Sequence, residues 1–156
     1  MPAVAPWNAA RADEIIAEHK DRPGALLPLL HALQDAFGHI PEQAIRQVAE
    51  ALNLSRAEVH GVVSFYHDFR STPPGRHVLK LCQAEACQAM GCRLLAAEVQ
   101  ERLGIRLGET TPDGRVTLEA VYCLGLCATA PSAMLDGEVH GRLTPAHAAA
   151  LLETLA

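Results

Sequence analysis

The sequence has no long apolar run, no basic cluster and few aromatic residues. Its 156 residues carry a formal net charge of −5 and include only three Phe, two Tyr and one Trp. No apolar segment approaches the roughly 20 residues that a membrane-spanning helix needs. A nucleic-acid-binding protein usually carries a basic patch, and none is present here. We therefore expect no nucleic-acid partner and no direct membrane contact.

The N-terminal stretch also lacks a targeting pattern. MPAVAPWNAARADEII has neither the basic stretch and apolar core of a secretory signal nor the Arg- and Ser-rich character of a transit peptide. We expect a cytoplasmic protein. All five cysteines lie between residues 82 and 127, and the first half of the chain has none. An odd number of cysteines without an export signal disfavours a disulfide framework and favours metal binding, redox chemistry or buried thiols.

Residues 1–70 follow a helical pattern. Apolar residues recur at helical spacing in four stretches, namely 9–20, 23–38, 41–53 and 55–63. Five histidines are scattered among them without metal-ligand spacing: His19, His31, His39, His60 and His67. We expect a helical bundle that serves packing or docking.

Residues that begin or end helices agree with this pattern. Pro23 and Pro41 suit the first turn of a helix, where the missing backbone N–H costs nothing. Gly38 suits a helix end, and Ser55 followed three residues later by Glu58 has the pattern of a capping box. We therefore place helix boundaries at these positions.

Consecutive prolines and a glycine interrupt the chain in STPPGRH, residues 71–77, and neither a helix nor a sheet continues through them. We expect three parts: a helical segment over 1–70, a linker over 71–76 and a second domain over 77–156.

The second domain alternates strand and helix patterns. The expected elements are a strand over 77–82, a helix over 88–104, a strand over 115–123, a hairpin over 132–143 turning at Asp136-Gly137, and a last helix opened by Thr144-Pro145. This order, β-α-β-β-β-α, predicts an α+β fold with a small thioredoxin-like sheet.

Four cysteines form two spaced pairs in this domain. Cys82 ends the first expected strand and Cys87 follows it in a C-x4-C pattern, whereas Cys123 ends the second strand and Cys127 follows in a C-x3-C pattern. A right-handed crossover between parallel strands brings their carboxyl ends to one edge of the sheet, where ligands bind. We expect these four thiols to form one site.

The fifth cysteine, Cys92, is expected outside that site. In a helix that starts near Cys87, Cys92 would lie roughly 7.5 Å further along the axis and about 140° around it. Cys92, Leu95, Val99 and Leu103 also form one apolar stripe. We interpret Cys92 as a buried thiol of the core.

The spacing of the four cysteines favours some of their possible roles over others. Structural zinc sites usually contain a C-x2-C turn, and thioredoxin-type dithiol exchange uses one too; this sequence has none. A [2Fe–2S] cluster takes two thiolates on each iron, which suits two wider pairs. No histidine stands where a Rieske centre would need it. The spacing favours iron–sulfur over zinc, with disulfides last.

Specific roles are also predicted for three residues of the two cysteine loops. Gly125 suits the turn between Cys123 and Cys127. Glu85 is the only charged residue inside either cysteine loop, so its carboxylate should make reduction of a cluster harder. Cys87 is expected at a helix N-terminus, which favours a thiolate.

The cysteine pattern resembles a known family. C-x4-C and C-x3-C followed by ATAP, together with EVHGVVSFYHDF and GRLTP, resemble the thioredoxin-like [2Fe–2S] subunit of the NADH-dehydrogenase module of respiratory complex I. That family includes the small subunits of NAD-reducing hydrogenases and of NAD-dependent formate dehydrogenases. CQAEACQAMGC and the short length resemble most the gamma subunit of a molybdenum- or tungsten-containing formate dehydrogenase.

The resemblance implies ligands, partners and an activity. By matching position, the cluster ligands are Cys82, Cys87, Cys123 and Cys127, and Cys92 is left out. The chain would have no independent active site. It would exchange electrons with the FMN of a larger NAD(H)-binding subunit, and through it with a molybdenum or tungsten subunit that oxidises formate. Thioredoxin-like folds often have a cis proline, so Pro131 is a candidate for one.

Three alternatives remain at this point. The first is the equivalent subunit of complex I or of an NAD-reducing hydrogenase, with the same local chemistry. The second, from another class, is a zinc-stabilised binding module in which the same four cysteines close a structural site. The third is a free-standing ferredoxin, which the helical segment disfavours because a diffusing carrier needs little beyond its cluster domain.

Overall fold

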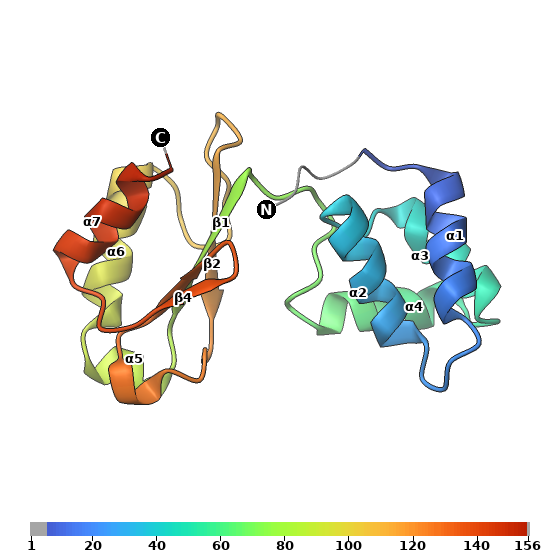
Figure 1. The fold of residues 1–156 in the computed structure, drawn as a ribbon, viewed down its shortest axis with the longest axis horizontal. Coiled ribbons are helices and arrows are strands. Elements are labelled where there is room, and N and C mark those ends of the chain that lie inside the picture. Colours follow the sequence, from blue (N-terminus) through green and yellow to red (C-terminus); the bar gives the residue numbers. More distant parts are fainter. Residues whose placement is uncertain (1–5, 156) are drawn as a thin grey trace. The chain divides into compact units, whose positions relative to one another are not determined.

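The computed structural model describes residues 6–155 (Figure 1). Residues 1–5 and 156 lie outside the described residues. The first five residues of the expected helical segment and the last residue of the expected second domain are therefore not described. The chain divides at the Pro73–Pro74 bond into two compact units. The first is helical, and the second combines helices with a four-stranded mixed sheet, so the α+β class is confirmed.

The helical unit consists of α1 (Ala9–His19), α2 (Leu26–Phe37), α3 (Glu42–Ala51) and α4 (Arg56–Phe65). Each helix turns an apolar stripe inward, as the sequence pattern predicts. The most deeply buried side chains of this core are Leu29, Leu30, Leu33, Phe37, Ile40, Val48 and Val59. The apolar stripes on these helices thus form one continuous core.

Most of the expected helix boundaries in this unit are confirmed. Gly38 ends α2 with a left-handed φ of 71°, and the Ser55 and Glu58 side chains form the capping box that starts α4. The prediction for Pro23 is wrong, because α2 begins only at Leu26. Gly24 follows Pro23 with a left-handed φ of 66°, which a right-handed helix cannot accommodate.

The sheet of the second unit has the order β2-β1-β3-β4. Its strands are β1 (His77–Cys82), β2 (Val116–Val121), β3 (Ala133–Leu135) and β4 (Glu138–His140), and only β1 and β2 pair in parallel. Two helices, α6 (Cys92–Leu103) and α7 (Pro145–Glu153), pack on one face of this sheet (Figure 1). The parallel pair therefore brings the chain segments after β1 and β2 to one edge.

Two element boundaries in this unit differ from expectation. The single helix expected over 88–104 is two helices, α5 (Glu85–Ala89) and α6, because Gly91 between them has a left-handed φ of 84°. The strand β2 ends at Val121 and not at Cys123, since Cys123 has a φ of 134°, which no strand residue adopts.

Other local expectations are confirmed. Asp136 and Gly137 turn the β3–β4 hairpin with positive φ angles of 51° and 92°. The Thr144 side chain accepts a hydrogen bond from the His147 backbone N–H and starts α7. The Ala130–Pro131 peptide bond is cis. None of the helices in the described part of the chain is both long enough and apolar enough to cross a bilayer.

Candidate [2Fe–2S] site

The first cysteine pair is buried. Cys82, the last residue of β1, is 3% exposed, and Cys87, in the short helix α5, is 2% exposed. The Cys82 backbone N–H donates to the Ser132 carbonyl oxygen at 3.0 Å. Both thiols are thus held inside the protein, one by the sheet and the other by the turn of helix that follows it.

The second pair lies at the surface. Cys127 begins the 3₁₀-helix η1 (Cys127–Thr129), and its Sγ lies 3.7 Å from the Sγ of Cys123. Both side chains are exposed. The Gly125 backbone N–H donates to the Cys123 Sγ at 3.3 Å, and Gly125 adopts a φ of 77° that suits glycine. The expected role of Gly125 in this turn is confirmed.

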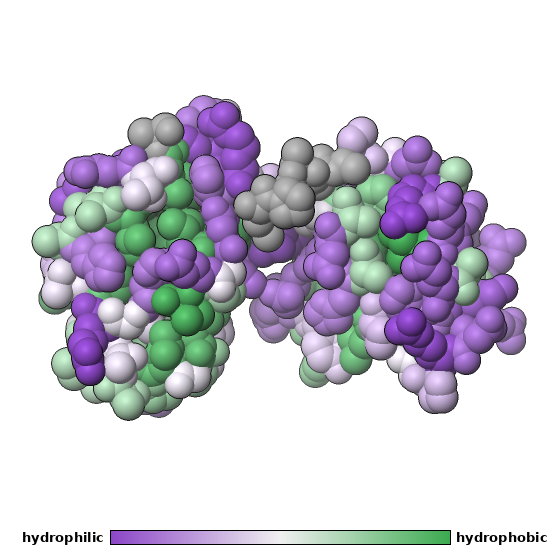
Figure 2. Space-filling view, viewed as in Figure 1, coloured by the Kyte–Doolittle hydropathy of each residue, from purple (hydrophilic) through white to green (hydrophobic). Residues whose placement is uncertain are grey.

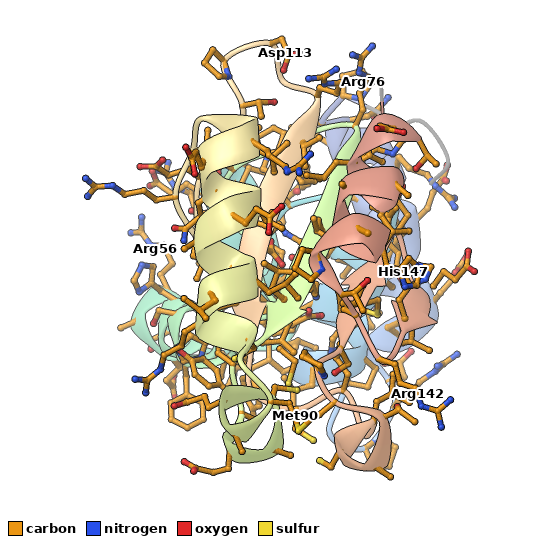
Figure 3. The ribbon with its side chains drawn as sticks, turned by 90° about the vertical axis from the view of Figure 1, so that its left-hand side faces the viewer. Arg56, Arg76, Met90, Asp113, Arg142 and His147 are labelled. Atoms are coloured by element: carbon orange, nitrogen blue, oxygen red, sulfur yellow. The ribbon has the colours of Figure 1, made fainter. Side chains whose placement is uncertain are left out.

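The fold brings the two pairs to the same end of the second unit. Cys82 stands opposite Val121, the last residue of β2, and α5 packs against η1. The neighbouring Cys123 sulfur raises the pKa of the Cys127 thiol, and the more distant Cys87 and Cys82 thiols raise it further. Figure 3 shows sulfur atoms gathered at this end, beside the labelled Met90. We call Cys82, Cys87, Cys123 and Cys127 the cysteine site.

Cys92 is buried beside the first pair, but its thiol is directed at the side chain of Gln83. Cys92 is 3% exposed, packs with Cys82 and Cys87, and its thiol lies 3.7 Å from the Gln83 Oε1. Burial raises the pKa of the Cys92 thiol, and the Cys87 and Cys82 thiols raise it further. The premise of one helix running from Cys87 through Cys92 is wrong, but the expected burial of Cys92 is confirmed.

Sequence reasoning missed one residue of the site, Ser132. It lies 45 residues from Cys87 along the chain, yet its Oγ is 3.6 Å from the Cys87 Sγ. Ser132 is also only 3% exposed. No spacing pattern in the sequence connects the two residues, because only the antiparallel pairing of β3 with β1 places Ser132 there.

Exposed apolar side chains accompany the cysteine site. Met90, Leu94 and Tyr122 are 62%, 81% and 76% exposed, and they lie in the segments that carry Cys87, Cys92 and Cys123. Figure 2 shows mostly white to green surface at the lower end of this unit, where Figure 1 draws α5. Large apolar side chains exposed to water near a site are typical of a surface that binds a partner.

The donor set fits a [2Fe–2S] cluster. Such a cluster is held by four thiolates, two on each iron, and the site offers four cysteines in two pairs. All five cysteines are free thiols, and the 3.7 Å between Cys123 and Cys127 is far beyond the roughly 2.05 Å of a disulfide. Within residues 6–155, no three His, Cys, Asp or Glu side chains converge as ligands of a single metal ion.

Comparison with known proteins identifies the family. The model of the thioredoxin-like [2Fe–2S] ferredoxin family matches residues 12–156. A subunit of the NADH-quinone oxidoreductase of Rhizobium meliloti is 40% identical over 138 residues, covering 88% of this chain and 82% of its own. The HndA subunit of the NADP-reducing hydrogenase of Solidesulfovibrio fructosivorans is 35% identical over 132 residues, covering 85% and 77%.

A solved structure agrees with these relatives. A crystal structure of an air-oxidised NAD⁺-reducing [NiFe]-hydrogenase superposes with a TM-score of 0.73 at 29% identity. The superposition covers 87% of this chain but only 23% of that hydrogenase chain, so this chain corresponds to a small part of it. The family match extends across both units, and it favours a [2Fe–2S] cluster over the zinc alternative. The chain therefore belongs to the thioredoxin-like [2Fe–2S] ferredoxin family, whose cofactor is a [2Fe–2S] cluster.

Proposed function

We propose that this chain is the electron-transfer subunit of a cytoplasmic NAD-dependent formate dehydrogenase complex. In this proposal Cys82, Cys87, Cys123 and Cys127 hold the [2Fe–2S] cluster. The observation that carries the proposal is the arrangement of the cysteine site, with one pair buried and the other exposed beside apolar side chains. Such a site is anchored on its inner side and open to a partner on its outer side.

The residues of the site have separate tasks. Cys82 and Cys87 tie the site to β1 and α5 and keep water from its inner side, because both are almost fully buried. Cys123 and Cys127 lie at the surface, where a partner can approach. The bound cluster supplies reversible one-electron transfer. Met90, Leu94 and Tyr122 offer an apolar contact surface, and burying it would exclude water from the contact.

The proposed partner is the FMN-containing, NAD(H)-binding subunit of the complex. One relative and one solved structure support an NAD-linked complex, since the relative is named as a subunit of an NADH-quinone oxidoreductase and the structure is that of an NAD⁺-reducing hydrogenase. Formate oxidation would take place on a further, molybdenum- or tungsten-containing subunit. This narrower choice is supported by the resemblance of CQAEACQAMGC, residues 82–92, to formate dehydrogenase gamma subunits.

A second candidate is the equivalent subunit of complex I or of an NAD-reducing hydrogenase. The names of the relatives favour it, because they include subunits of NADH-quinone oxidoreductases from Rhizobium meliloti and Pseudomonas aeruginosa. The cysteine site would be identical in both cases. The two candidates therefore differ only in the catalytic subunit that supplies or receives electrons.

Purification of the intact complex from its native host through a tag on this chain tests both candidates. We expect the complex to contain a flavoprotein and a molybdenum or tungsten subunit, and to reduce NAD⁺ with formate. Quinone reduction by NADH, or hydrogen-dependent NAD⁺ reduction without formate activity, would replace the first candidate by the second. A purified chain that contains zinc and no iron would overturn both.

A further inference from the structure

Ser132 connects the two buried cysteines of the site. It lies immediately before β3, and its carbonyl oxygen accepts the backbone N–H of Cys82 at 3.0 Å. Its hydroxyl oxygen lies 3.6 Å from the Sγ of Cys87. One residue thus contacts the backbone of one proposed ligand and the sulfur of the other.

The Ser132 hydroxyl has no alternative partner among the described residues. Ser132 is 3% exposed, so bulk water does not reach its side chain, and the only hydrogen bond that its hydroxyl makes within residues 6–155 is to the Cys87 sulfur. A buried polar group left without a hydrogen bond costs free energy. This contact is therefore what satisfies the hydroxyl.

The direction of that hydrogen bond follows from the chemistry of the sulfur. A free Cys87 thiol could donate or accept. A sulfur that binds iron is a thiolate without a proton, so it can only accept. In a chain with bound cluster, the Ser132 hydroxyl must therefore be the donor and the Cys87 sulfur the acceptor.

We propose that Ser132 is a positioning residue that donates a hydrogen bond to the Cys87 sulfur and thereby raises the reduction potential of the cluster. The inference rests on the proposed function, because it requires Cys87 to be a ligand. A donor aimed at a ligand sulfur stabilises the added negative charge of the reduced state, and hydrogen bonds to sulfur are among the factors that set cluster potentials. The hydroxyl keeps its proton throughout, and only one electron enters or leaves.

Redox titration of the cluster-loaded full-length chain, followed by electron paramagnetic resonance, tests this role. In Ser132→Ala we expect the ratio of reduced to oxidised cluster at a fixed ambient potential to fall by up to about tenfold, which is a midpoint about 59 mV more negative for a one-electron couple. Ser132→Thr keeps the hydroxyl and should restore the potential of the unchanged protein.

Thr117→Val is a matched control. Thr117 is another buried hydroxyl of the same unit, but its Oγ1 accepts from the Gly75 backbone N–H at 2.6 Å and does not contact a cysteine. We expect this variant to lose stability and keep the wild-type potential. An equal shift in Thr117→Val and Ser132→Ala would overturn the proposed role.

The outcomes separate this inference from the proposed function. A wild-type chain without iron would contradict the proposed function itself. An intact cluster with unchanged potential in Ser132→Ala would overturn only the role of Ser132. Should Ser132→Ala assemble no cluster, the matched pair Ser132→Thr and Ser132→Val decides, because the two side chains have nearly the same shape and only threonine donates a hydrogen bond. A lower potential in Ser132→Val than in Ser132→Thr supports the role, and equal potentials overturn it.

Discussion

The sulfur atoms of Cys123 and Cys127 lie 3.7 Å apart at the surface of the second unit, on a loop where Cys123 has the unusual φ of 134°. A non-glycine residue in this region is strained, and such strain concentrates at functional sites. The pair lies at the same end of the second unit as Cys82 and Cys87. We therefore expect both pairs to bind one cluster.

Replacing each cysteine by serine should separate four ligands from one core thiol. We expect Cys82→Ser, Cys87→Ser, Cys123→Ser and Cys127→Ser to lose most of the bound iron and acid-labile sulfide. Cys92→Ser should retain both, because the buried Cys92 thiol is directed at the Gln83 Oε1, 3.7 Å away. Iron and sulfide analysis per chain measures the effect. Loss of the cluster in Cys92→Ser with retention in Cys87→Ser would reverse the assignment.

Removing the charge of Glu85 should raise the reduction potential. Glu85 is exposed and begins α5, two residues before Cys87. A solvent-screened unit charge contributes a few tenths of a kcal/mol, which is on the order of 10–20 mV for a one-electron couple. Glu85→Gln should therefore shift the midpoint upward by about this amount. Glu101→Gln, an exposed carboxylate further along α6, is the control, and an equal shift in both would refute the local effect.

Replacing Asp136 should destabilise the second unit. Its Oδ2 lies 2.7 Å from the His77 Nδ1, and its Oδ1 accepts the Val78 backbone N–H at 2.8 Å. Asp136→Ala removes both bonds and leaves alanine at a left-handed φ of 51°, so we expect a loss of roughly 1–3 kcal/mol in the free energy of unfolding. Asp136→Asn tolerates this backbone conformation and keeps an acceptor for Val78, so its loss should be smaller in denaturant titrations. Equal losses would contradict this explanation.

The capping box of α4 should make stability depend on pH. Hydrogen bonds from the Ser55 side chain and backbone hold the pKa of Glu58 below its ordinary value. A lowered carboxyl pKa stabilises the fold above the pKa of the unfolded chain, and this stabilisation is lost as the pH falls through the folded-state pKa. Ser55→Ala should therefore lower Tm more at pH 7 than at about pH 3.

Ser64→Ala is the control for the capping box. Ser64 lies in the same helix, but its Oγ donates to the Gly61 carbonyl oxygen and has no carboxylate partner among residues 6–155. The change in Tm for Ser64→Ala should be independent of pH in the acid range. If Ser55→Ala shows the same pH-independent loss, the interaction with Glu58 is not responsible.

Local signals predicted much of the fold because they act over a few residues. Ser55 with Glu58, the left-handed Gly38 and the Thr144 N-cap each complete their hydrogen bonds within one helical turn, and all three lie where the sequence placed them. The predicted boundaries failed where a residue adopts a positive φ that the pattern does not reveal, as Cys123 does beyond the end of β2. Gly24 excluded Pro23 from α2, and Gly91 divided the helix after Cys87.

The sequence by itself determined the cysteine spacing, the strand–helix order and the helix boundaries that depend on neighbouring residues. Only the tertiary structure decided which side chains meet across the sheet. The pairing of β3 with β1 brings Ser132 to Cys87 across 45 residues of chain. The α5–η1 contact brings Cys87 near Cys127. Such contacts depend on strand register and packing between distant segments, which no local pattern of residues encodes.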